Sequence, residues 1–160
     1  MIVNSMRFGE IEIEDKKIIQ FPQGIPGLED IKRFALVYNE ETKPISWLQA
    51  IDSPAISLPV IDPFLILPNY VFDILQEDIN DLSIAHESDI HVVNVLVIPE
   101  DMEKMTINLA APILINIKLN LGKQIFIDGK DYLVRKPVFE LIRSCLKGVH
   151  AGACVDEKSE

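Results

Sequence analysis

The stretch FPQGIPGLED, residues 21–30, places two prolines and two glycines within six residues, one residue after the apolar pair Ile18-Ile19. Glycine-rich loops can cradle phosphate, but those motifs have wider glycine spacing or a following Lys-Ser/Thr pair, and neither is present here. A turn explains the stretch better, because proline fixes φ and glycine adopts positive φ without a steric penalty. We therefore predict that Gly24 and Gly27 are structural turn residues.

On either side of this turn, apolar residues alternate with other residues in short segments, as in Ile56-Leu58-Val60 and Ile125-Ile127. A period of two is typical of strands. Two denser runs rich in β-branched residues, 92–98 and 113–117, predict more fully buried strands. Proline and glycine recur between the segments, and we expect Pro63 and Pro112 to be structural turn residues. Many short strands with frequent turns predict a sandwich or a barrel.

Helical patterns are few and short. They cover residues 26–31, 77–82 and 138–146. The last segment places Phe139, Ile142 and Leu146 on one face, as an amphipathic helix requires. The chain of 160 residues suits one domain with a single core. We expect that domain to span residues 1–147, including a C-terminal helix, and residues 148–160 to form a flexible tail.

The charge balance limits the classes of partner. The chain carries 25 acidic and 15 basic residues, a formal net charge of −10. Such a surface repels nucleic acid, whose binding depends on neutralising phosphates, so we expect no direct nucleic-acid contact. It attracts a basic protein partner, although the acidity also suffices simply to keep the domain in solution.

The sequence also indicates a compartment. No run approaches the roughly 18 apolar residues that cross a bilayer, and the segment MIVNSMRFGE lacks the basic-then-apolar layout of a secretion signal. We therefore expect a cytoplasmic protein without a membrane partner. Cys145 and Cys154 fit neither a zinc pattern nor a disulfide framework, which predicts reduced thiols.

No catalytic constellation stands out. His86 and His91 lie five residues apart around HESDIH, a weak metal pattern, and solvated loop positions explain them better. Carboxylate groups recur in pairs, but adjacent carboxylates on loops are usually solvated, because acid–base catalysis needs burial to separate their pKa values. We expect no enzyme activity, no catalytic residues, no metal and no cofactor.

The turn stretch also resembles the amino-terminal signature of the flagellar assembly factor FliW family. The resemblance rests on Phe21, Gly24, Ile25, Gly27, Leu28 and Glu29. Further stretches agree in order, namely Trp47-Leu48-Gln49 before Asp52, Ile61-Asp62-Pro63 before Tyr70, and NLAAPILIN at 108–116 before Gln124. These stretches span most of the chain, and the ordered set is fairly specific.

The resemblance implies a mainly β, small single-domain β-barrel-like fold of many short antiparallel strands with a few short helices. It also implies two protein partners, flagellin and the RNA-binding translational repressor CsrA. In that scheme the factor antagonises CsrA, and unsecreted flagellin competes for the factor and so frees the repressor. Flagellin translation is thereby coupled to flagellin secretion.

Residues carried over from the resemblance are candidates for partner binding, because polar side chains at loops or strand ends have little packing role. These candidates are Glu29, Asp62, Tyr70, Asn108 and Asn116. A cap or turn hydrogen bond is the alternative role for each. The acidic loop with Glu100, Asp101 and Glu103 is a further candidate, because it can steer a basic partner.

Two other functions remain open at the level of sequence. One is a small-ligand-binding β-barrel whose interior holds an apolar molecule. The other is a metal-dependent hydrolase that uses His86, His91 and neighbouring carboxylates.

Overall fold

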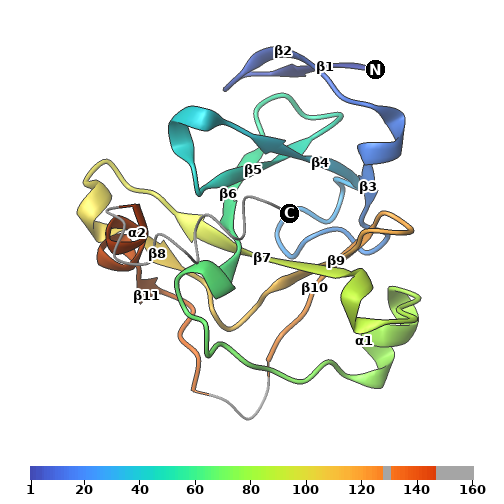
Figure 1. The fold of residues 1–160 in the computed structure, drawn as a ribbon. Helices are drawn as coiled ribbons and strands as arrows, with labels where there is room; N and C mark the ends of the chain where they lie inside the picture. Colours follow the sequence, from blue (N-terminus) through green and yellow to red (C-terminus); the bar gives the residue numbers. More distant parts are fainter. Residues whose placement is uncertain (128–130, 147–160) are drawn as a thin grey trace.

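The computed structural model describes residues 1–127 and 131–146, and two sheets run through them (Figure 1). The strands are β1 (Ile2–Ser5), β2 (Gly9–Glu12), β3 (Ile19–Gln20), β4 (Arg33–Tyr38), β5 (Ser46–Ala50), β6 (Ser57–Ile61), β7 (Ile90–Val97), β8 (Thr106–Ile107), β9 (Ile113–Asn116), β10 (Leu121–Gln124) and β11 (Lys136–Pro137). The helices are α1 (Gln76–Asp81) and α2 (Phe139–Leu146), with short 3-10 turns η1 (Asp15–Lys17), η2 (Glu40–Thr42), η3 (Pro63–Leu65), η4 (Glu87–Asp89) and η5 (Met102–Lys104).

The larger sheet closes into a barrel. Its strands follow the order β7, β6, β5, β4, β3, β10 and β9, and β9 also pairs with β7, which returns the sheet to its start. Every pairing around this ring is antiparallel except β3 with β10, where Leu121 lies opposite Gln20. The structure thus confirms the mainly β, barrel-like fold, and it decides for a barrel where the strand pattern alone left a sandwich open.

The barrel is filled by side chains, which we call the inner core. Its buried members are Ile19, Phe21, Ile25, Phe34, Leu48, Ala50, Val60, Val93, Ile113 and Ile115. The period-two alternation explains this set, because Phe34 and Leu36 on β4 face inward while Ala35 belongs to a different cluster outside. The rings of Phe21 and Phe34 meet edge to face with centroids 5.2 Å apart. Aromatic packing of this kind stabilises the barrel centre.

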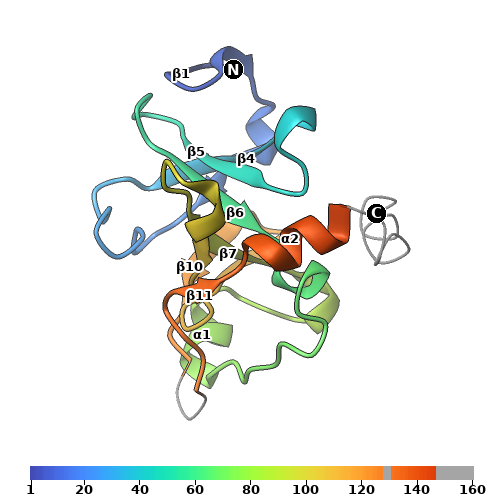
Figure 2. The ribbon, with the colours of Figure 1, turned by 90° about the vertical axis from the view of Figure 1, so that its left-hand side faces the viewer.

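A second cluster, the outer core, lies on the other face of the sheet. It joins the strands to the η3 region and to α2, and its buried members are Ile45, Trp47, Ile61, Ile66, Tyr70, Leu96, Met105, Ile107, Leu109, Val138 and Ile142. Figure 2 shows α2 lying across the molecule beside β7. The predicted C-terminal helix is confirmed as α2. The tail predicted for residues 148–160 lies outside the described residues.

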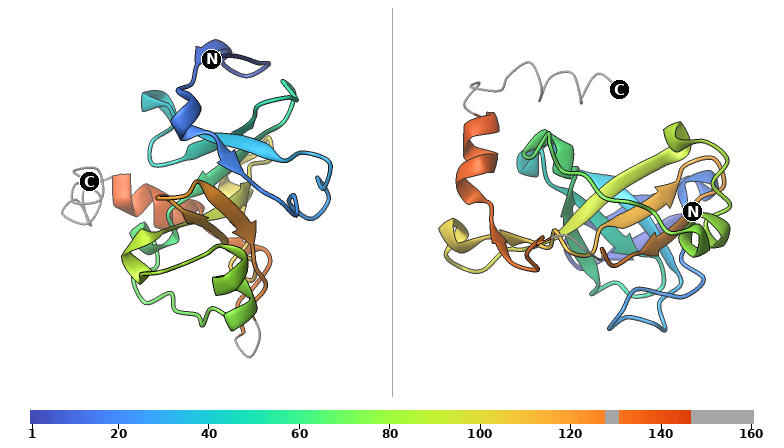
Figure 3. Two further views of the ribbon diagram at one scale, coloured as in Figure 1. Left: turned by 90° about the vertical axis from the view of Figure 1, so that its right-hand side faces the viewer. Right: turned by 90° about the horizontal axis from the view of Figure 1, so that it is seen from below.

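The β1–β2 hairpin forms the separate small sheet and packs on the outside of the barrel (Figures 1 and 3). Val3 and Ile13 bury against Ala35 and Ile51, which are outward-facing residues at β4 and just after β5. The hairpin covers an apolar strip that would otherwise be exposed to water.

The helix predicted over residues 77–82 is confirmed as α1, but the helix predicted over 26–31 is wrong. Gly24 and Gly27 have φ of +68° and +89°, and Ile25 and Leu28 form an isolated bridge between these tight turns. The helical spacing of apolar residues has another cause, since Ile25 and Leu28 pack onto the inner core from a folded loop. Hydrophobic spacing reports burial, and a compact loop can meet it as well as a helix.

The reduced thiol predicted for Cys145 is also wrong, because this residue takes part in a disulfide. Cys154 lies outside the described residues. Cysteine pairing depends on where the backbone brings two β-carbons together, and the spacing of cysteines along the chain does not contain that information.

Candidate functional site

The turn at residues 21–30 holds the first candidate, Glu29. Its carboxylate accepts a hydrogen bond from the backbone N–H of Gly27 at 3.0 Å. This bond lowers the pKa of Glu29 below its ordinary value, so the exposed side chain stays charged. A Cβ on Gly24 would lie 2.6 Å from the backbone of Glu29, so only glycine allows the chain to fold back here. The turn therefore presents an anion at a defined place on the surface.

Asp62 and Pro63 form the start of η3. Asp62 Oδ1 accepts from the backbone N–H of Phe64 at 2.9 Å, and Pro63 occupies the first position of the turn, where no N–H is needed. The side chain of Asp62 is half-buried. Local capping explains both residues, and a role of Asp62 in partner binding stays a prediction.

Tyr70 is buried in the outer core, where its hydroxyl group takes part in a small polar network. The hydroxyl donates to the carbonyl of Leu109 at 2.6 Å and accepts from Asn94 Nδ2 at 3.2 Å. Asn94 also donates to the carbonyl of Asn108 at 2.9 Å. Burial raises the pKa of Tyr70 to about 12, against the opposing hydrogen bond from Asn94. The network ties the η3 region to β7 and to the segment before β9.

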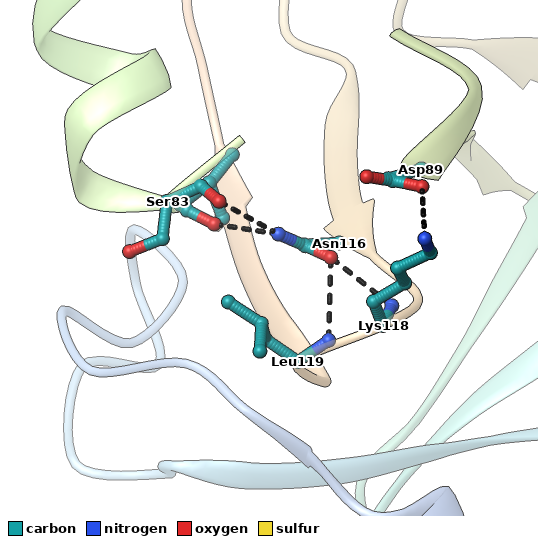
Figure 4. Close-up of polar contacts among 6 residues, drawn as sticks. Ser83, Asp89, Asn116, Lys118 and Leu119 are labelled. Carbon is teal, nitrogen blue, oxygen red and sulfur yellow. Dashed lines mark hydrogen bonds and ion pairs between the residues drawn. The ribbon is translucent and has the colours of Figure 1, made fainter. Parts of the chain in front are cut away.

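Asn116, at the end of β9, is a buried hydrogen-bonding centre (Figure 4). Its Nδ2 donates to the carbonyls of Leu82 and Ser83 at 2.8 and 3.3 Å. Its Oδ1 accepts from the backbone N–H groups of Lys118 and Leu119 at 3.0 and 3.2 Å. The side chain thus joins the end of α1 to the β9–β10 turn, and its groups face inward.

The two remaining candidates in the stretch 108–116, Asn108 and Pro112, have local contacts. Asn108 Oδ1 accepts from the backbone N–H of Ala110 at 3.0 Å, which holds a turn between β8 and β9. Pro112 is buried directly before β9, and its carbonyl accepts from the N–H of Ile125 at 2.9 Å.

The acidic loop of Glu100, Asp101 and Glu103 is exposed between β7 and β8. Asp101 Oδ1 accepts from the backbone N–H of Glu103 at 3.1 Å and so caps η5. The carboxylates of Glu100 and Glu103 have no such role among the described contacts of the loop. The structure therefore gathers these three candidates on one surface, while Glu29, Asp62 and Asn116 lie elsewhere.

Two features escaped the sequence reasoning. Asn94 lies fully buried within the apolar run of β7, and a lone amide in such a run was a usable signal for an internal network. Lys123 on β10 binds Asp78 Oδ1 at 2.6 Å and Asp81 Oδ2 at 2.7 Å, a cluster without any local signal because β10 and α1 are distant in sequence.

The positive and negative side chains of this cluster stabilise each other's charges. Burial by itself lowers the pKa of Lys123, but the hydrogen bonds to the two carboxylates outweigh it, and the net shift is upward. The hydrogen bonds from Lys123 and then Gln23 lower the pKa of Asp81. Lys123 and Asp81 therefore stay charged over the neutral range.

The same structure bears on the two alternative functions, the metal-dependent hydrolase and the ligand-binding barrel. His86 is exposed and His91 is half-buried on β7, and the described residues contain no group of three metal-binding side chains. The inner core occupies the barrel where the ligand-binding alternative places an apolar molecule. In the described part of the chain, no helix is long and apolar enough to span a bilayer.

Fold and site together define a small, filled β-barrel whose exposed candidate groups lie on loops and turns outside the barrel. Residues 2–138 match the family model of the FliW protein. The chain belongs to this family, the FliW flagellar assembly factors.

Individual relatives support this family assignment. The flagellar assembly factor FliW of Thermoanaerobacter pseudethanolicus is 43% identical over 145 residues, which cover 90% of this chain and 97% of the relative. That of Alkaliphilus metalliredigens is 38% identical, covering 89% of each chain. A crystal structure of the flagellar assembly factor FliW superposes with a TM-score of 0.82 at 33% identity, over 87% of this chain and 97% of the other.

Proposed function

We propose that this protein is a cytoplasmic, non-enzymatic flagellar assembly factor that binds and antagonises the translational repressor CsrA and also binds flagellin. The observation that carries the proposal is the exposed acidic loop of Glu100, Asp101 and Glu103 on a chain of net charge −10. An RNA-binding repressor needs a basic surface to neutralise phosphates, and an acidic protein surface is complementary to it.

The proposed regulation follows from competition between the two partners. While flagellin accumulates inside the cell, it occupies the factor, and the freed repressor silences flagellin translation. After flagellin is secreted, the factor captures the repressor again. Capture inhibits the repressor either by covering its RNA site or by favouring a state that binds RNA poorly, and the second route requires different affinities for the two states.

Calorimetric titration with CsrA of the same organism tests the proposal. We expect binding at moderate salt, and we expect saturation with flagellin to abolish it. Co-elution on gel filtration provides an independent readout of each complex. If neither protein gives heat or co-elutes, the proposed function is wrong, and a thermal-shift screen of metabolites against the barrel becomes the next experiment.

A further inference from the structure

A groove of about 330 Å³ lies between the turn at residues 23–29, the start of α1 and the end of β10. This volume is at the lower end of the range for ligand sites, which suits one or two side chains of a partner. The groove is lined by the candidate Glu29 and by Lys123 and Asp78 of the ion cluster. It therefore combines features that the sequence does not place together.

Part of the groove is apolar and open to solvent. Leu75 and Phe126 line it with 54% and 62% of their surfaces exposed, and Pro26 adds a third apolar side chain. Large apolar side chains exposed around a hollow are typical of a surface that another molecule covers. We expect these residues to contact an apolar side chain of that molecule.

The charged part of the groove is anionic. The ammonium of Lys123 is paired with both Asp78 and Asp81 and its side chain is only 16% exposed, so it is not offered to an anion. Of the charged side chains that line the groove, Asp78 balances Lys123, and Asp81 lies outside the lining. Glu29 leaves the lining with one negative charge in excess, and its exposed carboxylate is held by the N–H of Gly27. The groove therefore favours a cationic group.

We propose that this groove docks a segment of the basic RNA-binding partner, with an apolar side chain on Leu75 and Phe126 and an adjacent Arg or Lys near Glu29. The choice of partner rests on the proposed function, because charge complementarity selects the basic one of the two proteins. Glu29 is the residue that orients the cation, since its carboxylate is exposed and fixed by the turn.

The groove and the acidic loop act on different steps of partner binding. Figures 1 and 3 place η5 and α1 on opposite sides of the molecule. Exposed charges act mainly on the rate of encounter, whereas an apolar anchor in a hollow acts on the rate of dissociation. The acidic loop steers the partner, and the groove retains it.

The test uses three groove variants, Phe126→Ser, Leu75→Ser and Glu29→Gln, and one control, Ile2→Ser on the exposed hairpin. Glutamine keeps an oxygen for the Gly27 N–H and removes only the charge. Ile2 is 68% exposed, so the control also removes an exposed apolar side chain. Circular dichroism verifies the fold of each variant, and surface plasmon resonance with CsrA and with flagellin gives the rate constants.

We expect each serine variant in the groove to speed dissociation of CsrA by about tenfold and Glu29→Gln to do so by about threefold, with the control unchanged. Wild-type affinity for CsrA in all three variants overturns the groove while leaving the proposed function intact. If the groove variants lose binding to flagellin but keep binding to CsrA, the choice of the basic partner is overturned.

If wild-type protein binds neither partner, the proposed function fails, and the groove is then tested separately. The probe is an amidated peptide with leucine and arginine side by side, titrated to millimolar concentration and followed by amide NMR shifts. Shifts at Gly24, Lys123 and Phe126 that vanish when the arginine is replaced by glutamate support the groove. No shift at these residues overturns it.

Discussion

At the scale of single residues, the polar side chains in the interior act as connectors between segments. Asn116 serves four backbone groups from two segments. Asn94 donates to the Tyr70 hydroxyl and to the carbonyl of Asn108, and Tyr70 donates to the carbonyl of Leu109, before β9. Gln49 is fully buried and accepts from the hydroxyl of Ser5 at 2.7 Å, which ties the hairpin to β5. A buried polar group costs free energy unless it is paired, so these side chains depend on the exact arrangement of their neighbours.

Replacing Asn116 tests this connector role. Asn116→Asp keeps an acceptor for Lys118 and Leu119 but removes the donor to the carbonyls of Leu82 and Ser83. We expect a loss of about 2–3 kcal/mol in the free energy of unfolding, because buried carbonyls are left unpaired beside a new charge. Urea denaturation measures it, and Asn69→Asp at an exposed position is the control. Equal stability of both variants would contradict the role.

The pKa of Tyr70 leads to a prediction at alkaline pH. The value is about 12 in the folded protein and ordinarily 10.0, so the unfolded chain loses this proton first. The contribution of Tyr70 to stability is therefore complete below pH 10 and declines as the pH rises towards 12. We expect the stability difference between wild type and Tyr70→Phe to shrink over that range, as measured by urea denaturation. A constant difference would show that Tyr70 does not titrate in this way.

At the scale of elements, close approaches between backbone and side chains set the shape of the barrel. A Cβ on Gly122 in β10 would lie 2.4 Å from the ring of Phe21, so glycine at this position makes room for the aromatic pair of the inner core. The loop after Phe21 then folds back through Gly24 and Gly27 and places Ile25 and Leu28 on the inner core. The turn thus belongs to the packing of the barrel as well as to its surface.

The two turn glycines allow a matched comparison. Both have positive φ, but an added Cβ meets nothing within 4 Å at Gly27, whereas at Gly24 it meets the backbone of Glu29 at 2.6 Å. Gly27→Ala should cost about 1–2 kcal/mol of stability from backbone strain alone. Gly24→Ala should cost more, because the backbone must also move apart.

Thermal unfolding of both alanine variants measures this difference. Gly24→Ala should lower the midpoint of thermal unfolding further than Gly27→Ala. Equal midpoints would mean that the loop opens to admit the Cβ without cost.

At the scale of the whole molecule, a filled barrel holds two separate surface features in fixed positions. The acidic loop follows β7, and the groove lies between the turn, α1 and β10. The two surfaces are built from different segments, so each can be altered by substitutions that leave the residues of the other in place. This separation makes the kinetic roles of loop and groove distinguishable.

Charge reversal tests steering by the acidic loop. The double variant Glu100→Lys/Glu103→Lys leaves Asp101 to cap η5 and should slow association with CsrA at low salt by about tenfold. Its association rate should also depend less on salt. The control Glu10→Lys/Glu12→Lys changes the net charge equally on the exposed β2 strand. Stopped-flow measurements give the association rates over a range of salt concentrations. If the rates of the double variant match those of the wild type at every concentration, the loop does not steer the partner.

Much of the fold follows from local pattern. The period-two pattern and the dense apolar runs predict strands that the structure contains at β6, β7 and β9, and the amphipathic segment near the carboxyl end predicts α2. The strand predicted at Ile125-Ile127 is wrong, because β10 ends at Gln124. These predictions succeed because alternation and helical spacing are properties of one element. The same logic failed at residues 26–31, where apolar residues pack from a compact loop. Only the resemblance to a family chose the barrel over a sandwich before the structure did.

Some surface properties can likewise be predicted from the sequence, and others depend on the tertiary structure. Net charge and the acidic loop of Glu100, Asp101 and Glu103 can be read from the sequence, since neighbouring exposed residues stay neighbours in the fold. The closure of β9 onto β7, the connector role of Asn116 and the groove that joins Glu29 to Lys123 required the tertiary structure. Each of these depends on contacts between segments far apart in sequence, and pairing at that range is decided by the packing of the whole chain.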